Sequence, residues 1–286
     1  MQKLKQVIII LYLIFSITFP VKACTLWAAT GKCTENNTTL IVKNRDWKPD
    51  NHNELMLIIP EKGYSFLALY SAGGGYEGVK GGINEKGLVI VTATASTIPS
   101  EERVEGKGFL IELLRNYESV KAVLENREIF SSGKPGFYMI GDREHIAVIE
   151  IGMNGEFAVK EIEDGILYHT NHYTDEKLLK FNKKENESSK IRYNRIKYLL
   201  ENHANPLKIE DFIDMSQDTH DGPDNSIWRT GSTPKKTRTL GTWIVAIPKN
   251  DFPELYIKFA NPEEDERIYR FTLDEAFWES GKFKEK

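Results

Sequence analysis

Cys24 is the residue of this chain whose position most clearly suggests chemistry. Residues 1–23 have a basic start, an apolar run and a Val-Lys-Ala end, as in a signal peptide with its cleavage site. Cleavage after Ala23 makes Cys24 the first residue of the mature chain. Its α-amine, which titrates at about pH 7.7–8, then lies beside its own thiol and can serve that thiol as a general base.

Two other interpretations of Cys24 stay open on position alone. Val-Lys-Ala-Cys is close to a lipoprotein signal, in which the cysteine is lipidated and its amine acylated, although Lys22 fits such a signal poorly. An oxidising compartment also permits a disulfide between Cys24 and Cys33. Evidence from further along the chain is needed to choose among the three.

Length and composition describe an ordinary globular protein. Removing residues 1–23 leaves 263 of the 286 residues, and the 40% hydrophobic and 28% charged content predicts a sizeable core. The net charge is −4, and loss of the three leader lysines makes it −7, which gives no reason to expect a nucleic-acid or anionic-membrane partner. After Phe19 no apolar run approaches the roughly 20 residues that span a bilayer. We therefore expect a secreted or cell-envelope protein with one domain over 24–286.

The candidate residues lie among short strand-like segments and a few helix-like ones. Apolar or β-branched runs separated by turn formers predict strands. These runs are Thr25–Thr30, Thr38–Val42, Leu55–Ile59, Tyr64–Tyr70, Leu88–Thr94, Phe137–Gly141, Ile146–Ile151, Phe157–Ile162, Ile166–His169, Thr239–Ile247 and Leu255–Phe259. Spacings of three and four predict helices over Phe109–Leu124, Ser188–His203 and Leu207–Met215. The order of elements predicts an α+β domain of layered sheets with helices outside.

Two motifs are weaker than they look. Gly73–Gly78 satisfies G-x-G-x-x-G, but the residues after it are not helical, so a loop bordering a pocket is the better interpretation than a nucleotide site. His169 and His172 have a metal-like spacing, yet residues three apart on an extended segment point to opposite faces. No acidic or thiol cluster stands near them to complete a zinc site. We expect no metal and no organic cofactor.

Lys43-Asn44-Arg45-Asp46 places two cations, an amide and a carboxylate at the end of a predicted strand. Such a group is most often a solvated strand end. A carboxylate near an N-terminal amine has a specific use, however, because it can accept hydrogen bonds and fix the nucleophile's rotamer and charge. Asn171 can likewise donate a neutral N–H to an oxyanion.

Taken in order, these segments resemble a known family along nearly the whole mature chain. The motifs are Cys24-Thr25, Asn44–Trp47, Gly82–Leu88, His169–His172, Ser189–Arg195 and Arg238–Leu240. The chain is similar to the N-terminal-nucleophile hydrolases of linear amides, which include choloylglycine hydrolases, penicillin V acylases and isopenicillin N acyltransferases. Each motif is weak alone, and their shared order carries the resemblance.

The resemblance implies a four-layer αββα fold with the nucleophile at the start of a central strand. Cys24 matches the catalytic cysteine, Asp46 the aspartate that orients it, and Asn171 the asparagine of the oxyanion hole. A backbone N–H near Thr94 matches the second oxyanion donor. Arg238 is the candidate for a late active-site arginine, and Arg229 is its rival.

One departure from the family pattern concerns the cations. The family writes Arg-Asn-x-Asp, whereas here Lys43 stands at the arginine position and Arg45 at the variable one. Lys43 and Arg45 should share one face of the strand and Asp46 should point to the other. We therefore expect both cations to lie at the substrate site, with their separate roles undetermined.

We expect an exported cysteine amidohydrolase that acts on a small N-acyl compound and forms a thioester. Within the same superfamily the alternatives are an exported dipeptidase and an acyltransferase. From another class, the alternative is a lipidated surface protein that binds ligands without catalysis. We expect loops to build the substrate pocket, including Tyr64–Gly82 and His220–Lys236.

The first testable prediction is the processing site. Exported protein should begin at Cys24 with a free amine, since the Val-x-Ala boundary directs cleavage after Ala23. Intact-mass measurement of the exported chain checks this. A diacylglyceryl mass on Cys24, or active protein that retains residues 1–23, contradicts it.

Overall fold

Two antiparallel sheets face each other in the computed structural model, which describes residues 23–103, 108–204 and 206–281. Residues 1–22 of the expected signal peptide lie outside this part of the chain. The first sheet has six strands in the order β10-β1-β2-β11-β12-β13, and the second runs β3-β4-β5-β6-β7-β8-β9. The bounds of the six-stranded sheet are β1 Ala23–Thr30, β2 Thr39–Trp47, β10 Gly165–His169, β11 Arg238–Ile247, β12 Glu254–Phe259 and β13 Arg267–Thr272. Those of the seven-stranded sheet are β3 His52–Ile58, β4 Phe66–Ala72, β5 Gly78–Asn84, β6 Val89–Thr94, β7 Gly136–Gly141, β8 Ile146–Ile151 and β9 Phe157–Ile162.

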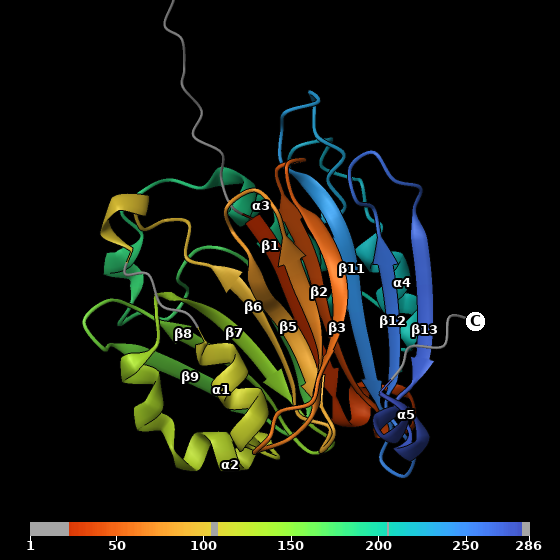
Figure 1. Ribbon diagram of the computed structural model, residues 1–286. Helices are drawn as coiled ribbons and strands as arrows, with labels where there is room; N and C mark the ends of the chain where they lie inside the picture. The colour runs from red at the N-terminus through yellow and green to blue at the C-terminus, as the bar shows by residue number, and fades with distance from the viewer. Residues whose placement is uncertain (1–22, 104–107, 205, 282–286) are drawn as a thin grey trace, which may run out of the picture.

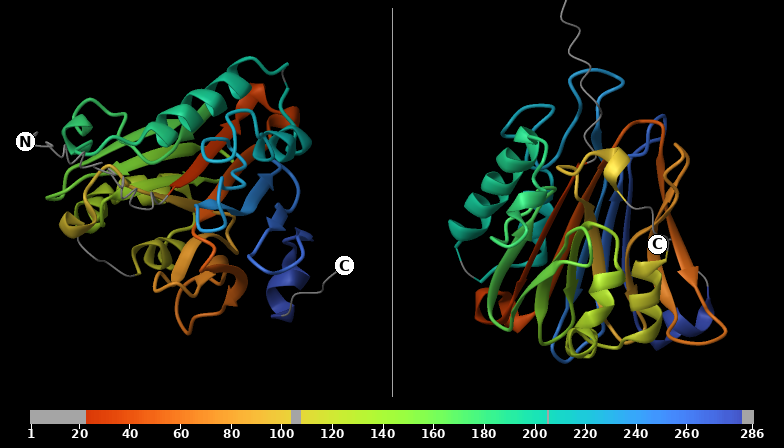
Figure 2. Two further views of the ribbon diagram at one scale, coloured as in Figure 1. Left: turned by 90° about the horizontal axis from the view of Figure 1, so that it is seen from above. Right: turned by 90° about the vertical axis from the view of Figure 1, so that its left-hand side faces the viewer.

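Helices cover the outer faces of both sheets (Figures 1 and 2). Helices α1 (Phe109–Asn116) and α2 (Val120–Glu125) pack on the seven-stranded sheet. On the far side, α3 (Glu187–Glu201) and α4 (Ile209–Ser216) pack on the six-stranded sheet. A short helix, α5 (Glu275–Ser280), closes the described chain. This is the predicted αββα sandwich.

Side-chain alternation along the strands explains the three apolar cores that separate the four layers of helices and sheets. On β1, Leu26 and Ala28 belong to the core between the sheets, while Trp27 and Ala29 belong to the core under α3 and α4. Residues of one strand thus enter both layers because successive side chains point to opposite faces. Strand β1 is buried along its whole length, which fixes its first residues in place.

One predicted element differs from that observed, and three observed elements were not predicted. The helix expected over Phe109–Leu124 is two helices, because Ser119 caps α2 by accepting a hydrogen bond from the Ala122 N–H at 3.2 Å. Strand β5 follows the glycine loop where no strand was expected, held by pairing with β4 and β6. Strand β13 and helix α5 were not predicted, and β13 is an edge strand whose side chains are largely exposed.

Asn84 joins the second sheet to its helix. The turn from β5 to β6 begins at this buried residue, whose side-chain oxygen accepts the N–H groups of Lys86 and Leu88. Its side-chain nitrogen donates to the carbonyls of Leu114 and Tyr117, at 2.8 and 2.7 Å, where α1 ends. Four backbone groups therefore depend on one amide side chain.

We predict that Asn84→Ala lowers the free energy of unfolding by about 3 kcal/mol, because buried backbone groups lose their partners. Denaturant unfolding measures this change. Asn126→Ala is the matched control, since exposed Asn126 makes one helix-end hydrogen bond to Ala122 and its loss should cost under about 0.5 kcal/mol. Equal losses in the two variants would contradict the assignment.

Candidate active site

Cys24 lies at the start of β1, where three strands of the six-stranded sheet meet. The register pairs Cys24 with Arg45 of β2 and Ala23 with Asp46. The residue Cys24 is 8% exposed, and its backbone nitrogen donates to Asn171 Oδ1 at 2.8 Å. The nitrogen that processing would turn into an amine therefore already has a hydrogen-bond acceptor.

Arg192 of α3 links the start of β1 to Asn171. Its Nη1 donates to the Cys24 carbonyl at 2.7 Å and to Thr25 Oγ1 at 2.8 Å, and its Nη2 donates to Asn171 Oδ1 at 3.0 Å. The side chain is fully buried, and burial lowers its pKa to about 10 while the Asp46 carboxylate opposes that shift. The guanidinium stays charged at neutral pH.

Arg192 lies within the motif Ser189–Arg195, and the sequence pattern alone predicts no role for this arginine. The signal that points to it is the buried stripe of α3, in which Ser189 and Arg192 precede Ile196 and Leu200. Polar residues at two successive inward positions of an amphipathic helix indicate a polar site beneath it.

Asn171 is held on every side. Its backbone N–H donates to Ser189 Oγ at 2.8 Å, and its carbonyl accepts the Ser96 N–H at 3.2 Å. Its side-chain nitrogen donates to the Thr94 carbonyl at 2.9 Å, which uses one of the two hydrogens of that amide. The end of β6, where a second oxyanion donor was expected, thus lies against Asn171.

Asp46 is the carboxylate of this cluster. It is fully buried, accepts a hydrogen bond from Thr239 Oγ1 at 2.8 Å, and lies 3.5 Å from Arg229 Nη1. Burial raises its pKa, and the charges of Arg229 and Arg192 and the Thr239 hydrogen bond limit the rise. Its ionisation therefore depends on the neighbouring guanidinium groups.

Arg229, rather than Arg238, makes the contact with Asp46. Thr239 stands opposite Asp46 and points to it, so Arg238, the preceding residue of β11, points to the other face of the strand. There Arg238 donates to the carbonyls of Thr233 and Pro234 at 3.3 Å. The structure joins Cys24 to Asn171 by a hydrogen bond and places Asp46 opposite Ala23 on the neighbouring strand, and it leaves Arg238 outside that set.

Lys43 and Arg45 point away from Asp46, toward the seven-stranded sheet, as the strand period predicts. Lys43 Nζ donates to the carbonyls of Lys80, at 3.0 Å, and Thr92. Burial lowers the pKa of Lys43 to about 8, and the nearby Cys24 opposes that shift.

The acceptors of Arg45 are also neutral. Its guanidinium donates to Asn53 Oδ1 at 2.6 Å, to Ser71 Oγ at 2.7 Å and to Asn51 Oδ1. Burial lowers its pKa to about 10, and Cys24 again opposes the shift. Among the described residues, no carboxylate forms an ion pair with either Lys43 or Arg45. The thiol thus lies near two buried cations that form no ion pair with a carboxylate among the described residues.

The remaining sequence candidates have structural partners. His169 contacts Glu150 at 3.1 Å and His172 contacts Ser189 Oγ at 2.8 Å, so the two rings face different surroundings. Cys24 and Cys33 are both free; Cys24 lies at the start of β1, and Cys33 lies in the turn that follows the end of this strand. An intrachain disulfide is therefore absent from this fold.

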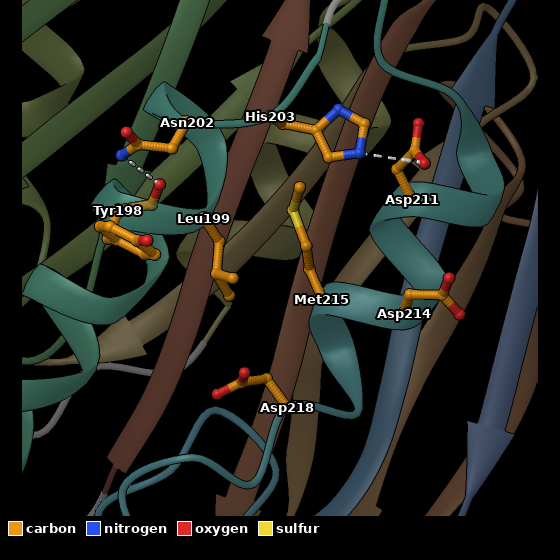
Figure 3. Close-up of a pocket in the computed structure, with 8 residues that line it drawn as sticks. All are labelled: Tyr198, Leu199, Asn202, His203, Asp211, Asp214, Met215 and Asp218. Atoms are coloured by element: carbon orange, nitrogen blue, oxygen red, sulfur yellow. Dashed lines mark hydrogen bonds and ion pairs between the residues drawn. The ribbon is translucent and has the colours of Figure 1, made fainter.

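A separate hollow of about 360 Å³ opens between α3 and α4 (Figure 3). Tyr198, Asp211 and Asp218 are among its lining residues, and His203 forms an ion pair with Asp211 at 3.2 Å. No residue of the Cys24 cluster lines it.

None of the described helices is long and apolar enough to cross a membrane.

Comparisons with known proteins agree with this architecture. A family model described as acyl-coenzyme A:6-aminopenicillanic acid acyl-transferase matches residues 33–264. A variant of conjugated bile acid hydrolase from Clostridium perfringens superposes with a TM-score of 0.54 at 14% identity, over 87% of this chain and 92% of that one. A Caenorhabditis elegans ortholog of N-acylethanolamine-hydrolyzing acid amidase gives a TM-score of 0.50 at 11% identity, over 79% and 93%. Comparison with curated protein sequences gives no significant match.

We predict that Arg229→Met moves the acidic limb of the kcat/KM profile to higher pH. Loss of the guanidinium raises the pKa of Asp46 further, so the carboxylate is protonated at a pH where it was ionised before. The pH dependence of kcat/KM measures the shift. Arg238→Met is the control and should shift the limb much less; a larger shift in that variant would make Arg238 the active-site arginine.

Proposed function

Because the chain belongs to the acyl-coenzyme A:6-aminopenicillanic acid acyl-transferase family of N-terminal-nucleophile enzymes, we propose that it is an exported cysteine amidohydrolase. Its substrate is a small N-acyl compound, and its nucleophile is the thiol of Cys24. The observation that carries the proposal is the hydrogen bond from the Cys24 nitrogen to Asn171 Oδ1, in a cluster with Arg192 and Asp46.

In the proposed reaction, cleavage after Ala23 frees the amine of Cys24, which takes the proton of its own thiol. The thiolate attacks the amide carbonyl carbon, and the carbon–oxygen π electrons move to the oxygen. When the tetrahedral intermediate collapses, the carbon–nitrogen bond breaks and the Cys24 ammonium protonates the leaving amine. Water then hydrolyses the thioester, releasing the acid and the free thiol.

Fixed dipoles contribute most to the rate by stabilising the oxyanion of the tetrahedral intermediate. We assign it the second side-chain N–H of Asn171 and a backbone N–H at the end of β6, near Thr94. Arg192 and the Thr94 carbonyl hold the amide in one orientation, so no reorganisation is needed as charge develops. Loss of one such donor typically costs about 10²–10³ in kcat.

Transfer of the acyl group to an amine is the second candidate, favoured by the description of the matching family model. The two activities share the thioester and differ in what attacks it. Adding an amine acceptor to the assay separates them, because an acyltransferase forms a new amide at the expense of free acid.

The nucleophile is tested with the mature protein and a panel of N-acyl amino acids, N-acylethanolamines, penicillin V and dipeptides. We predict that Cys24→Ala abolishes turnover without unfolding, and that Cys24→Ser leaves weak activity, because a hydroxyl is a poorer nucleophile than a thiol at neutral pH. Mass spectrometry should detect an acyl adduct on Cys24.

Cys33→Ser is the control for a general effect of thiol loss. The Cys33 thiol donates to the carbonyls of Thr30 and Gly165, at 3.2 and 3.3 Å, away from the site. This variant should keep most of the activity. Full turnover in folded Cys24→Ala protein would overturn the proposed function, and turnover of dipeptides alone would assign the chain as a dipeptidase.

A further inference from the structure

Lys80 is the extra residue of a bulge in β5. The register pairs Gly81 with Leu69 and Val79 with Tyr70, so Lys80 has no opposite residue on β4. Bulges redirect side chains and are frequent beside active sites. The Lys80 carbonyl accepts Lys43 Nζ and Thr92 Oγ1, each at 3.0 Å, so the bulge is held by one of the two buried cations near Cys24.

An aromatic pair supports the Lys80 side chain. Its ammonium lies 4.1 Å from the centre of the Tyr76 ring, and Tyr76 stacks on Trp47 with the centroids 4.5 Å apart. Trp47 directly follows Asp46 on β2. The aromatic pair therefore connects the end of β2, where Trp47 follows Asp46, with the Lys80 ammonium.

Arg45 fixes the loop that carries Tyr76. It donates to Asn51 and Ser71, and these two donate in turn to the carbonyls of Gly73, at 2.6 Å, and Tyr76, at 3.0 Å. Gly73, like the two glycines after it, has a positive φ that glycine adopts without strain. These hydrogen bonds hold the loop between β4 and β5 in one conformation.

Positive charge dominates this side of the site. Lys43, Arg45 and Lys80 bond only to neutral oxygens among the described residues, and the one carboxylate of the cluster, Asp46, points the other way toward Arg229. Burial lowers the pKa of Lys80 to about 7, and the charges of Arg45 and Lys43 lower it further. An anion beside Lys80 would offset this repulsion.

We propose that Lys80 binds a carboxylate of the substrate and makes the enzyme selective for N-acyl amino acids over neutral amides. The inference rests on the proposed function and adds the substrate class to it. Lys80 supplies a single point charge, which suits a monoanion. Trp47 and Tyr76 supply a flat apolar surface for the carbons next to that carboxylate.

N-decanoylglycine and N-decanoylethanolamine form a matched substrate pair, because they differ only by a carboxylate in place of a hydroxymethyl group. We expect Lys80→Met to lower kcat/KM for N-decanoylglycine about tenfold more than for N-decanoylethanolamine. The loss should appear mainly in KM, since a charge-assisted contact is lost. Lys80→Arg should keep most of the preference. An equal loss on both substrates would overturn the proposal.

Lys86→Met is the matched control variant. Lys86 also has its ammonium over a tyrosine ring, 5.5 Å from the centre of Tyr64, but it lies in the turn after β5 and is exposed. Removing it should change the ratio of the two kcat/KM values by less than about twofold. A tenfold change here would show that general surface charge sets the selectivity.

A second measurement does not depend on amide turnover. In a Cys33→Ser background the only thiol is that of Cys24, and its alkylation rates with iodoacetate and iodoacetamide compare an anionic with a neutral reagent. We expect Lys80→Met to lower the ratio of the two rates about tenfold. A lowered ratio without Cys24-dependent turnover would reject the proposed function and keep the anion site. Cys24-dependent turnover with an unchanged rate ratio and unchanged substrate preference would reject only the anion site.

Discussion

A buried guanidinium organises this site. Arg192 reaches from α3 through the six-stranded sheet's outer face and bonds at once to the Cys24 carbonyl and to Asn171 Oδ1. Burying such a charge is costly unless hydrogen bonds offset its lost hydration, so the acceptors of the two terminal nitrogens must stay where they are. One side chain thereby fixes the distance between the start of β1 and the asparagine that follows β10.

Strand order brings the other groups to the same place. With β1 between β10 and β2, and β11 beside β2, the start of β1, the end of β2, the end of β10 and the start of β11 lie at one end of the strands. Alternation on β2 then separates the charges: Asp46 faces Arg229, while Lys43 and Arg45 face the second sheet. The carboxylate of β2 is thus separated from its two cations because neighbouring residues of one strand point in opposite directions.

Much of the architecture was predictable because strongly apolar runs leave few choices. The central strands and the layered α+β class follow from such runs, and the order of weak motifs identified the family. Strand β5 was not predictable, since its glycine-rich sequence has little strand propensity and pairing with its neighbours holds it in the sheet. The contact of Arg229 with Asp46, in preference to Arg238, depends on the register between β2 and β11, which no local pattern contains. Arg192 was missed because the burial of an arginine is a property of the packed helix.

The bond from the Cys24 nitrogen to Asn171 has a consequence for when the protein becomes active. In a chain still joined to Ala23 this nitrogen belongs to a peptide bond and has no basic lone pair, yet its hydrogen bond is already formed. In the proposed mechanism, folding therefore builds the geometry and a single proteolytic cut supplies the base. Under that proposal the uncut chain is a zymogen whose proposed catalytic groups are already in position, and its activation requires no rearrangement of the fold.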